Sequence, residues 1–433
     1  MRISFNAGRP SPAPLAPFAP PRTPSSRAGL RPLRFIALLS ISAYSIQIQA
    51  CAASDADAET PSVDPSGQIP DLVDAGGADA AEGEDAGGTP LPCVPETLCP
   101  VGLLGPPDSG AAIDFRTRIS VIRGRSPSDV WVAGAAGAVA HFDGTTWTRT
   151  ETGTQQSVRA LWLRDAGEMA FTSIFPTSTL VRGIDLEPVA GQSPSADGWL
   201  VAEPIDPPAT LGYILTSAWA APDAEWLWAT AAANADWDSS NQGSTSGLWR
   251  ARIDPVGRTL EIRDLFPANA CKTLGCWWMT SIHGASADDL WAVGRNGAAF
   301  HITGAQGGSP TATAVDSRTW AVLNGVWAHG TEAFAVGARG TIRHYPGTGE
   351  RWDIVSDVPA TEELQAVWGT SPSDVWAVGN RACVLHYDGT HWSRIEVRGL
   401  GARKPDLYAV WTGTPGKVWI GGDGVVLTLG GEP

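Results

Sequence analysis

Several residue types are missing from long parts of this 433-residue chain, and their absence divides it into regions. Residues 1–130 contain none of the 20 tryptophans. Residues 1–50 contain no acidic residue, and residues 51–92 contain no lysine or arginine. Large aromatic side chains contribute much of a folded core. We therefore expect one large folded domain, 111–433, behind a segment that takes no part in its core.

Positive charge is scarce outside the first 50 residues. The formal net charge is −15, and loss of the basic leader, with its six arginines, would leave a still more acidic protein. Nucleic acids and anionic membrane surfaces both require a positive face on their partner. We therefore expect no nucleic-acid partner and no direct attraction to an anionic lipid surface.

The leader lacks an apolar run long enough for a membrane span. In RPLRFIALLSISAYSIQIQACAAS the run is about 15 residues, which suits the apolar core of a signal peptide better than a span of about 20. It ends in IQAC (48–51), which resembles the motif of bacterial lipoprotein signals. The resemblance implies that residues 1–50 are removed, that Cys51 is lipidated, and that the protein is anchored in the cell envelope. Because Ala52 follows Cys51, the family analogy favours the outer membrane. An ordinary secretory signal is the alternative.

Residues 51–92 contain no aromatic residue and ten acids. A segment of this composition cannot bury enough apolar surface to fold, and its charges repel one another. We expect an acidic, disordered tether, followed by a short lead-in, 93–110.

The six cysteines lack the flanking His and Cys residues that a metal site would need. Cys51 is assigned to lipidation. In an oxidising, exported compartment, the close pairs Cys93–Cys99 and Cys271–Cys276 are expected to form local disulfides. Cys383 lies in a strand pattern and is expected to be a buried free thiol. The sequence indicates no metal and no cofactor.

No segment of the chain shows sustained helical periodicity, which disfavours a helical solenoid. The stretch LQAVWGTSPSDVWAVGNRACVLHYDGTHWSRIEV (364–397) instead recurs in fragments along the domain. The copies align on seven residues: Trp131, Met169, Trp228, Trp291, Phe334, Trp376 and Trp419. Their last three intervals are 43, 42 and 43 residues, which is a propeller-blade period.

Each repeat contains four short strand patterns separated by turn residues, including the hairpin dipeptide Asp388-Gly389. The sequence thus predicts an all-β fold, a single seven-bladed β-propeller of four-stranded antiparallel blades. The last repeat stops after three strands, which would leave an open edge. We expect an N-terminal strand, at residues 111–117, to pair there and close the ring.

The motifs HFDGTTW (141–147) and HYDGTHW (386–392) resemble Asp-box (BNR-type) repeats, which occur in propellers of sialidases and of many non-enzymes. The repeat is also similar to that of photosystem-assembly-factor propellers and of bacterial propeller lipoproteins. These resemblances imply a propeller and no particular activity.

Four histidines recur ten residues after the aligned aromatic, and acids recur two residues before it. The histidines are His141, His301, His344 and His386, and the acids include Asp129, Asp289 and Asp374. A shared metal ring is excluded, because equivalent positions of neighbouring blades are too far apart for coordination at about 2 Å. We expect a structural His–acid hydrogen bond in each blade. Leu429 stands at the histidine position of the last repeat. The repeated tryptophans of the inner strands are expected to pack between blades.

Ligand-binding residues are expected on the face that carries the loops between second and third strands and between blades. The longest such loop, 232–247, presents Trp237 with Asp236 and Asp238. A calcium loop is disfavoured there, since the glycine and distal glutamate of such a loop are absent. Arg295, Arg339 and Arg381 occupy the equivalent turns of repeats four to six. They would form either an anion-binding arc or three solvated turn residues.

The leading hypothesis is a monomeric, non-enzymatic, envelope-anchored propeller that binds an envelope protein or a glycan through this loop face. The alternative is a secreted glycoside hydrolase or lyase, whose tyrosine nucleophile would be Tyr213 or Tyr408. A quinone-dependent dehydrogenase fits less well, because such propellers normally have eight blades.

Overall fold

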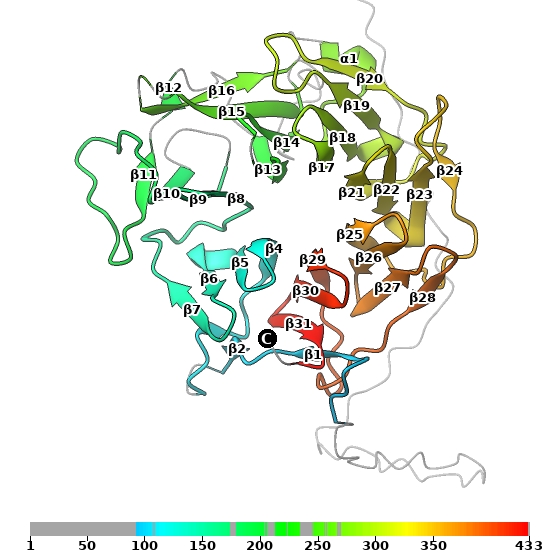
Figure 1. Cartoon of the computed structure of the whole chain (residues 1–433), viewed down its shortest axis with the longest axis horizontal. Helices are drawn as coiled ribbons and strands as arrows, with labels where there is room; N and C mark the ends of the chain where they lie inside the picture. The colour runs from blue at the N-terminus through cyan, green and yellow to red at the C-terminus, as the bar shows by residue number, and fades with distance from the viewer. Residues whose placement is uncertain are drawn as a thin grey trace, which may run out of the picture. The chain divides into compact units, whose positions relative to one another are not determined.

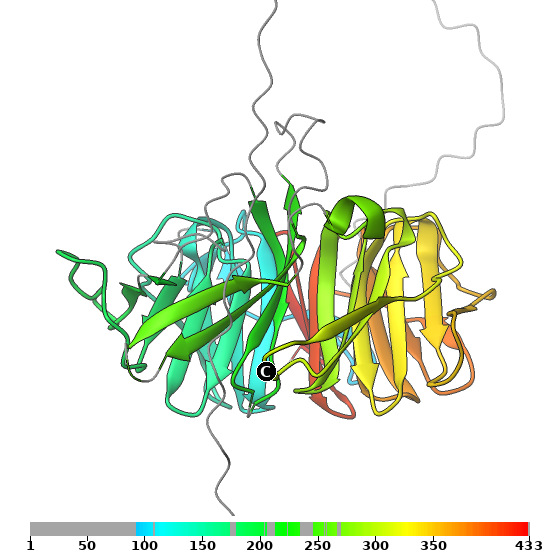
Figure 2. The ribbon, with the colours of Figure 1, turned by 90° about the horizontal axis from the view of Figure 1, so that it is seen from above.

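The computed structural model describes residues 92–431, apart from 107–108, 174–178, 203, 206–212, 223, 234–245, 255, 257 and 266–269. In this part of the chain, seven antiparallel sheets surround one axis as the blades of a β-propeller (Figure 1). Seen edge-on, their strands run between two faces (Figure 2). The predicted seven-bladed fold is confirmed. The predictions for Cys51 and for the rest of residues 1–91 concern residues outside the described part of the chain.

Four blades are regular four-stranded meanders. In every blade we letter the strands A to D from the axis outward. Blade 1 contains β4 (Ile119–Ser126), β5 (Asp129–Gly134), β6 (Val139–Phe142) and β7 (Trp147–Thr150). Blade 4 contains β17 (Met279–Ser286), β18 (Asp289–Gly294), β19 (Ala299–Thr303) and β20 (Thr311–Ala314). Blade 5 contains β21 (Leu323–His329), β22 (Glu332–Gly337), β23 (Thr341–Tyr345) and β24 (Asp353–Ile354). Blade 6 contains β25 (Leu364–Ser371), β26 (Asp374–Gly379), β27 (Cys383–Tyr387) and β28 (Trp392–Arg394).

Blades 2 and 3 are the divergent ones. Blade 2 contains β8 (Ala160–Arg164), β9 (Gly167–Phe171), β10 (Thr179–Arg182) and β11 (Leu200–Ala202). Blade 3 contains β13 (Tyr213–Trp219), β14 (Leu227–Ala233), β15 (Leu248–Asp254) and β16 (Thr259–Asp264). A fifth short strand, β12 (Pro204–Ile205), pairs in parallel with β16. The helix α1 (Ala270–Leu274) lies between blades 3 and 4.

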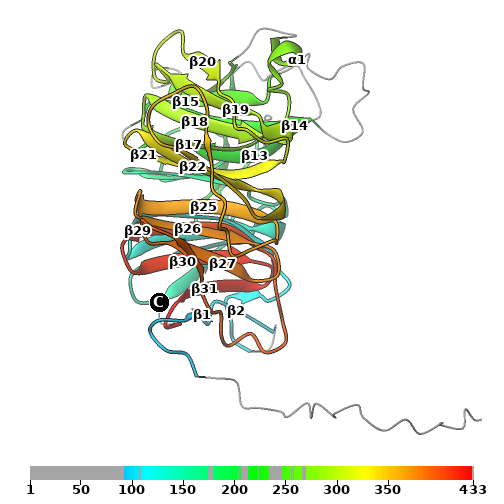
Figure 3. The same cartoon turned by 90° about the vertical axis from the view of Figure 1, so that its right-hand side faces the viewer.

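Blade 7 combines both ends of the domain. Strands β29 (Leu407–Thr414), β30 (Lys417–Gly422) and β31 (Val425–Leu429) come from the last repeat. The fourth strand is β1 (Leu98–Pro100), which pairs antiparallel with β31 (Figure 3). Strand β29 also contacts β4, so the inner strands form a closed ring.

An N-terminal strand therefore closes the ring as expected, but the segment predicted for it, 111–117, was wrong. Residues 113–114 form β3 (Ile113–Asp114), which pairs with β2 (Leu104–Gly105) outside the blades. Thr117 is two residues from the inner strand β4 and can reach about 7 Å from it. The outer edge of a blade lies three strand spacings, about 14 Å, from its inner strand. The end of the predicted segment is therefore too close to β4 to form the outer strand, and the observed closing strand comes from further upstream.

The aligned residue of every repeat lies on strand B, and most of these side chains are buried in the seams between blades. Trp131, Trp228 and Phe334 are at most 2% exposed. On the inner strands, three tryptophans lie against a glycine of the next blade. A Cβ atom on Gly124 would lie 2.5 Å from the Trp411 ring, and one on Gly284 would lie 2.4 Å from the Trp219 ring. The expected packing of inner-strand tryptophans between blades is therefore observed.

Both predicted disulfides are present, Cys93–Cys99 and Cys271–Cys276. The first joins β1 to the residues that precede it, and the second closes the loop that contains α1. Cys383 is a buried free thiol on β27, and burial raises its pKa to about 11. Among the described residues, no helix has the length and apolar character needed to cross a membrane.

We predict that Leu98→Ala destabilises the propeller by about 2–5 kcal/mol, because Leu98 is fully buried at the closing strand. Leu274→Ala removes the same atoms from a side chain that is 41% exposed and should cost less than about 1 kcal/mol. Urea unfolding of both variants measures the difference. Equal losses would show that β1 does not hold the ring closed.

Candidate functional site

A histidine, an acid and an aromatic ring lie together in four of the blades. Each histidine Nε2 lies within hydrogen-bond distance of a carboxylate: His141–Asp129 2.9 Å, His301–Asp289 2.8 Å, His344–Glu332 2.7 Å and His386–Asp374 2.7 Å. Each imidazole also lies against the aligned aromatic ring, with ring centroids 4.3–4.5 Å apart. In blades 1 and 6 the tryptophan N–H also donates to the same carboxylate.

Blades 2, 3 and 7 replace this histidine with other residues. The residues that pair with the aligned position are Val181, Arg250 and Thr428. The assignment of Leu429 to the histidine position was therefore wrong. The turn before β31 is one residue shorter than the equivalent turn of blades 1, 4, 5 and 6, and this moves Thr428 into register. Arg250 lies over Trp226, with its guanidinium carbon 4.1 Å from the ring centroid.

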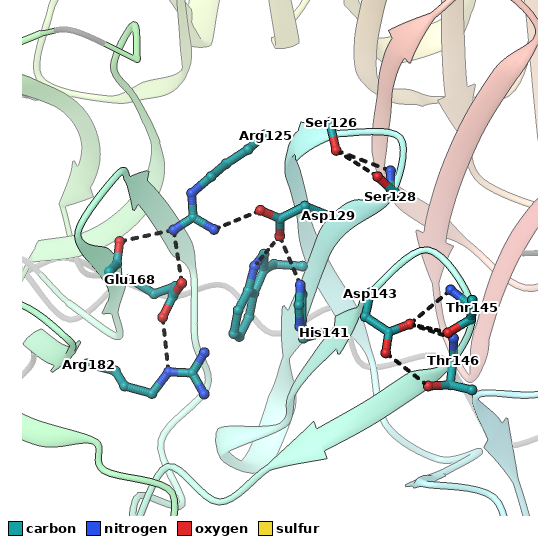
Figure 4. Close-up of polar contacts among 12 residues, drawn as sticks. Arg125, Ser126, Ser128, Asp129, His141, Asp143, Thr145, Thr146, Glu168 and Arg182 are labelled. Atoms are coloured by element: carbon teal, nitrogen blue, oxygen red, sulfur yellow. Dashed lines mark hydrogen bonds and ion pairs between the residues drawn. The ribbon is translucent and has the colours of Figure 1, made fainter.

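In blade 1 the same carboxylate belongs to a network that reaches the next blade (Figure 4). Arg125 donates to Asp129 Oδ2 (3.0 Å) and to Glu168 Oε1 of blade 2 (2.9 Å). Arg182 donates to the other oxygen of Glu168, at 2.9 Å. Every member has a partner within the protein, so these residues stabilise the contact between blades.

The Asp-Gly turns are held by a single carboxylate each. Asp143 Oδ1 accepts hydrogen bonds from the Thr145 and Thr146 N–H groups, both at 2.8 Å (Figure 4). Asp388 does the same for the Thr390 and His391 N–H groups. Hydrogen bonds to the charged form hold the pKa of both aspartates well below their usual range.

The axis of the propeller contains two cavities that meet end to end. The first, about 110 Å³, opens toward the face of the B–C and D–A loops. Its mouth is lined by one polar residue from each blade, near the start of the inner strand or, for Arg159, just before it: Ser120, Arg159, Thr216, Thr280, Asn324, Gln365 and Tyr408. Six of these lie at or beside a β-bulge, which is a device that redirects a side chain.

Tyr408 has a charged environment at this mouth. Its hydroxyl donates to Asp423 Oδ2 (3.2 Å), and the Arg118 guanidinium lies over its ring at 4.1 Å. Arg118 also donates to Asp423 Oδ1 at 2.9 Å. Burial and the Asp423 charge raise the pKa of Tyr408 to about 12. The phenol is therefore protonated at neutral pH, with a carboxylate positioned to accept its proton.

The second axial cavity, about 450 Å³, opens toward the A–B turns. We call it the aromatic cup. Each blade contributes to its wall the inner-strand residue that pairs with the aligned position: Arg123, Trp162, Trp219, His283, Trp327, Trp368 and Trp411. Arg123, His283 and Trp368 also line the first cavity, so they separate the two.

Burial lowers the pKa of Arg123 to about 10 and that of His283 well below its usual value. Arg123 adds to the effect on His283 through charge repulsion. His283 is therefore neutral at physiological pH.

A third cavity, about 500 Å³, lies on the B–C/D–A face beside blades 6 and 7, and we call it the basic groove. Its charged residues are Arg381, Arg394, Arg403, Lys404, Glu362 and Glu396. Glu362 accepts a hydrogen bond from Arg394 at 2.8 Å, and this lowers the pKa of Glu362 to about 2. Glu396 pairs with Arg398, at 2.9 Å.

The three arginines that the sequence singled out for binding do not line one cavity. Arg295 lies 3.9 Å above the Trp278 ring, and Arg339 adopts a left-handed backbone conformation in a neighbouring turn. Only Arg381 of the three lines the basic groove. Trp237, Asp236 and Asp238 lie outside the described residues. Tyr213 begins β13, in a blade different from that of Tyr408.

Sequence reasoning missed the aromatic cup and most of the basic groove. The cup residues precede the aligned residue by seven to nine positions in every repeat, so the alignment contained the signal. This signal was missed because the inner-strand tryptophans were assigned to packing between blades, and the same side chain can also line the axis. For Arg403 and Lys404 no signal existed, since their loop does not belong to the repeat.

No protein-family model matches the chain, and no curated protein matches it. Solved structures are similar in fold. YCF48 from Cyanidioschyzon merolae is 14% identical and aligns with a TM-score of 0.52, over 72% of this chain and 95% of that one. YCF48 bound to D1 peptide is 13% identical, with a TM-score of 0.51, over 78% and 97%. A streptogramin B lyase is 14% identical, with a TM-score of 0.50, over 73% and 93%. At such identities the likeness shows the propeller fold alone.

We predict that Asp129→Ala destabilises the protein by about 1–3 kcal/mol, since it leaves the buried Trp131 N–H without its acceptor and breaks the ion pair with Arg125. Asp289→Ala removes a carboxylate that, within the described residues, is hydrogen-bonded only to His301, and it should cost less. Guanidinium unfolding compares the two. If Asp289→Ala costs as much as Asp129→Ala, neither the indole hydrogen bond nor the Arg125 ion pair adds to stability.

Proposed function

We propose that this protein is a non-enzymatic, envelope-anchored propeller that binds an acidic segment of a partner protein in the basic groove. The observation that carries the proposal is the surplus of positive charge in this groove on an otherwise acidic protein. Four cations line it, and its two acids already have arginine partners. Carboxylates of a partner would supply the missing counter-charges.

The four cations of the groove differ in how many hydrogen bonds and ion pairs their side chains make within the protein. Among the described residues, the Arg403 side chain donates only to the backbone carbonyls of Asp423 and Gly424. Within the described part of the chain, the side chains of Arg381 and Lys404 make no hydrogen bond or ion pair, and both are exposed. These two cations are thus available to a ligand.

The groove also offers an apolar surface and a rigid backbone. Leu400, Ile395 and Val397 line it beside the cations, so that a segment with alternating acidic and apolar side chains would bury both kinds of group. Arg381 is fixed by its backbone N–H, which donates to Asp406 at 2.8 Å. A preformed site lowers the entropic cost of binding an extended chain. Peptide binding by a propeller of this fold, YCF48 with D1 peptide, supports a protein partner over a glycan.

We predict that Arg381→Glu/Lys404→Glu weakens binding of a short labelled acidic peptide by about tenfold or more, because two attractive contacts become repulsive. Fluorescence anisotropy at low salt measures the affinity, and the Gln/Asn version of the peptide should bind weakly. The control is Arg351→Glu/Lys417→Glu, which reverses two exposed cations that line none of the three cavities.

Equal binding by the two double variants would refute the groove as the peptide site. Preferential binding of an acidic polysaccharide that is lost in Arg381→Glu/Lys404→Glu would identify a glycan as the ligand of the groove instead.

The envelope location rests on the resemblance of residues 31–51 to a lipoprotein signal. Two or more acyl chains on Cys51 would anchor the protein stably. We propose the outer membrane as its site.

We predict that Cys51→Ser moves the protein from the membrane fraction to the soluble fraction of the cells. The measurement is fractionation followed by immunoblotting, with Cys383→Ser as the cysteine control. A Cys51→Ser protein that stays with the membrane would rule out lipid anchoring at this residue.

A hydrolase or lyase is the second candidate, and one observation favours it. Tyr408 has an acid partner, Asp423, and an arginine, Arg118, at the mouth of the axial cavity. The fold similarity to a streptogramin B lyase shows that such a propeller can support an enzyme. The cavity behind Tyr408 is only about 110 Å³, below the 300 Å³ or more of most ligand sites, so binding in the groove is the better supported function.

A further inference from the structure

Arg123 and His283 form the floor of the aromatic cup, and both have N–H donors without an acceptor among the described residues. Arg123 donates to the carbonyl oxygens of Ile122 (2.8 Å) and Ala218 (3.4 Å), which uses two of its five N–H groups. His283 is 6% exposed, and its Nδ1 accepts the Ala328 N–H at 3.2 Å. The proton of the neutral ring is therefore on Nε2, which makes no hydrogen bond within the described residues.

The floor also lacks a negative charge. Among the residues that line the cup, the only acid is Asp165, which lies at the A–B turn of blade 2. Arg123 forms no ion pair in the described part of the chain. A partly buried guanidinium beside a buried imidazole N–H, with no carboxylate, is an arrangement that a bound anion would complete.

The walls favour a ligand with a flat apolar side. Five tryptophans line the cup, and one of them, Trp368, contacts both floor residues. The Arg123 guanidinium lies 4.8 Å from its ring centroid, and the His283 ring lies 4.6 Å from it. A ligand whose anionic group binds Arg123 and His283 would therefore place its remaining atoms against the indole rings.

The rim adds polar groups above the tryptophans. Arg125, Asp165 and His329 line the cup near the A–B turns. These groups can exchange hydrogen bonds with hydroxyls, which an aromatic carboxylate would not offer. The volume of about 450 Å³ lies within the range of small-ligand sites.

We infer that the aromatic cup binds an acidic sugar unit of the uronic acid type. Its carboxylate accepts from Arg123 and the Nε2–H of His283, its C–H face stacks on the tryptophans, and its hydroxyls contact the rim. This site is on the face opposite the basic groove and is independent of the peptide-binding proposal.

Isothermal titration calorimetry of the full chain with digalacturonate, and with its neutral counterpart digalactose, tests the inference. We expect digalacturonate to bind at least about tenfold more tightly, since a charge-assisted hydrogen bond discriminates by at least this factor. Arg123→Met should lower the affinity for digalacturonate by a similar factor. The matched control is Arg164→Met, since Arg164 also lies over a tryptophan, Trp162, but does not line the cup.

Arg381→Glu/Lys404→Glu should leave digalacturonate binding unchanged, because it alters the other face. Absence of digalacturonate binding, equal binding of digalactose, or tighter binding of indole-3-carboxylate would overturn the inference. Loss of binding in Arg381→Glu/Lys404→Glu would also overturn it, by placing the sugar in the basic groove. If Arg123→Met does not fold, the comparison of the two sugars on the unaltered protein decides.

Discussion

Closure of the ring is the constraint on which the rest of this structure depends. Seven similar sheets can bury their aromatic residues only if each has a neighbour on both sides, and the first and last repeats find each other through β29 and β4. The outer edge of the last blade is then completed by β1, three residues long, with Leu98 fully buried. The backbone around β1 is also bonded to blade 6, where the Leu98 N–H donates to the Glu396 carbonyl. A strand from the start of the domain thus links its last two blades.

The closed ring gives the two faces different chemistry. In every blade, one residue near or just before the start of the inner strand lines the B–C/D–A mouth, and another further along the strand lines the aromatic cup. The first set is mostly polar and the second mostly tryptophan. Arg123, His283 and Trp368 form the boundary between them. The propeller therefore presents a polar, charged mouth with a basic groove on one side and an aromatic recess on the other, although its blades are built from one repeat.

The blades were predictable from the sequence because each repeat has the same hydrophobic pattern and turn residues, so seven weak signals support one another. The short turn before β31 shifted the register by one residue and put Thr428 where Leu429 was expected. The closing strand was not predictable, because a three-residue strand has no pattern and its partner is more than 300 residues away. The pairing of Tyr408 with Asp423 and the clustering of Arg403 with Arg381 depend on loop paths that the repeat does not encode.

The position of the Cys93–Cys99 disulfide has a mechanical consequence. Tension applied at the N-terminal side of the domain passes through this covalent bond directly to β1, and the residues between the two cysteines carry little of the load. Strand β1 is held on one side by β31 and on the other by the backbone near Val397, so separating it requires several hydrogen bonds to break together. With the disulfide reduced, the same tension would first straighten the turn that precedes the strand. Whether the Cys93–Cys99 disulfide is intact thus determines which segment unfolds first when the propeller is pulled from its N-terminal side.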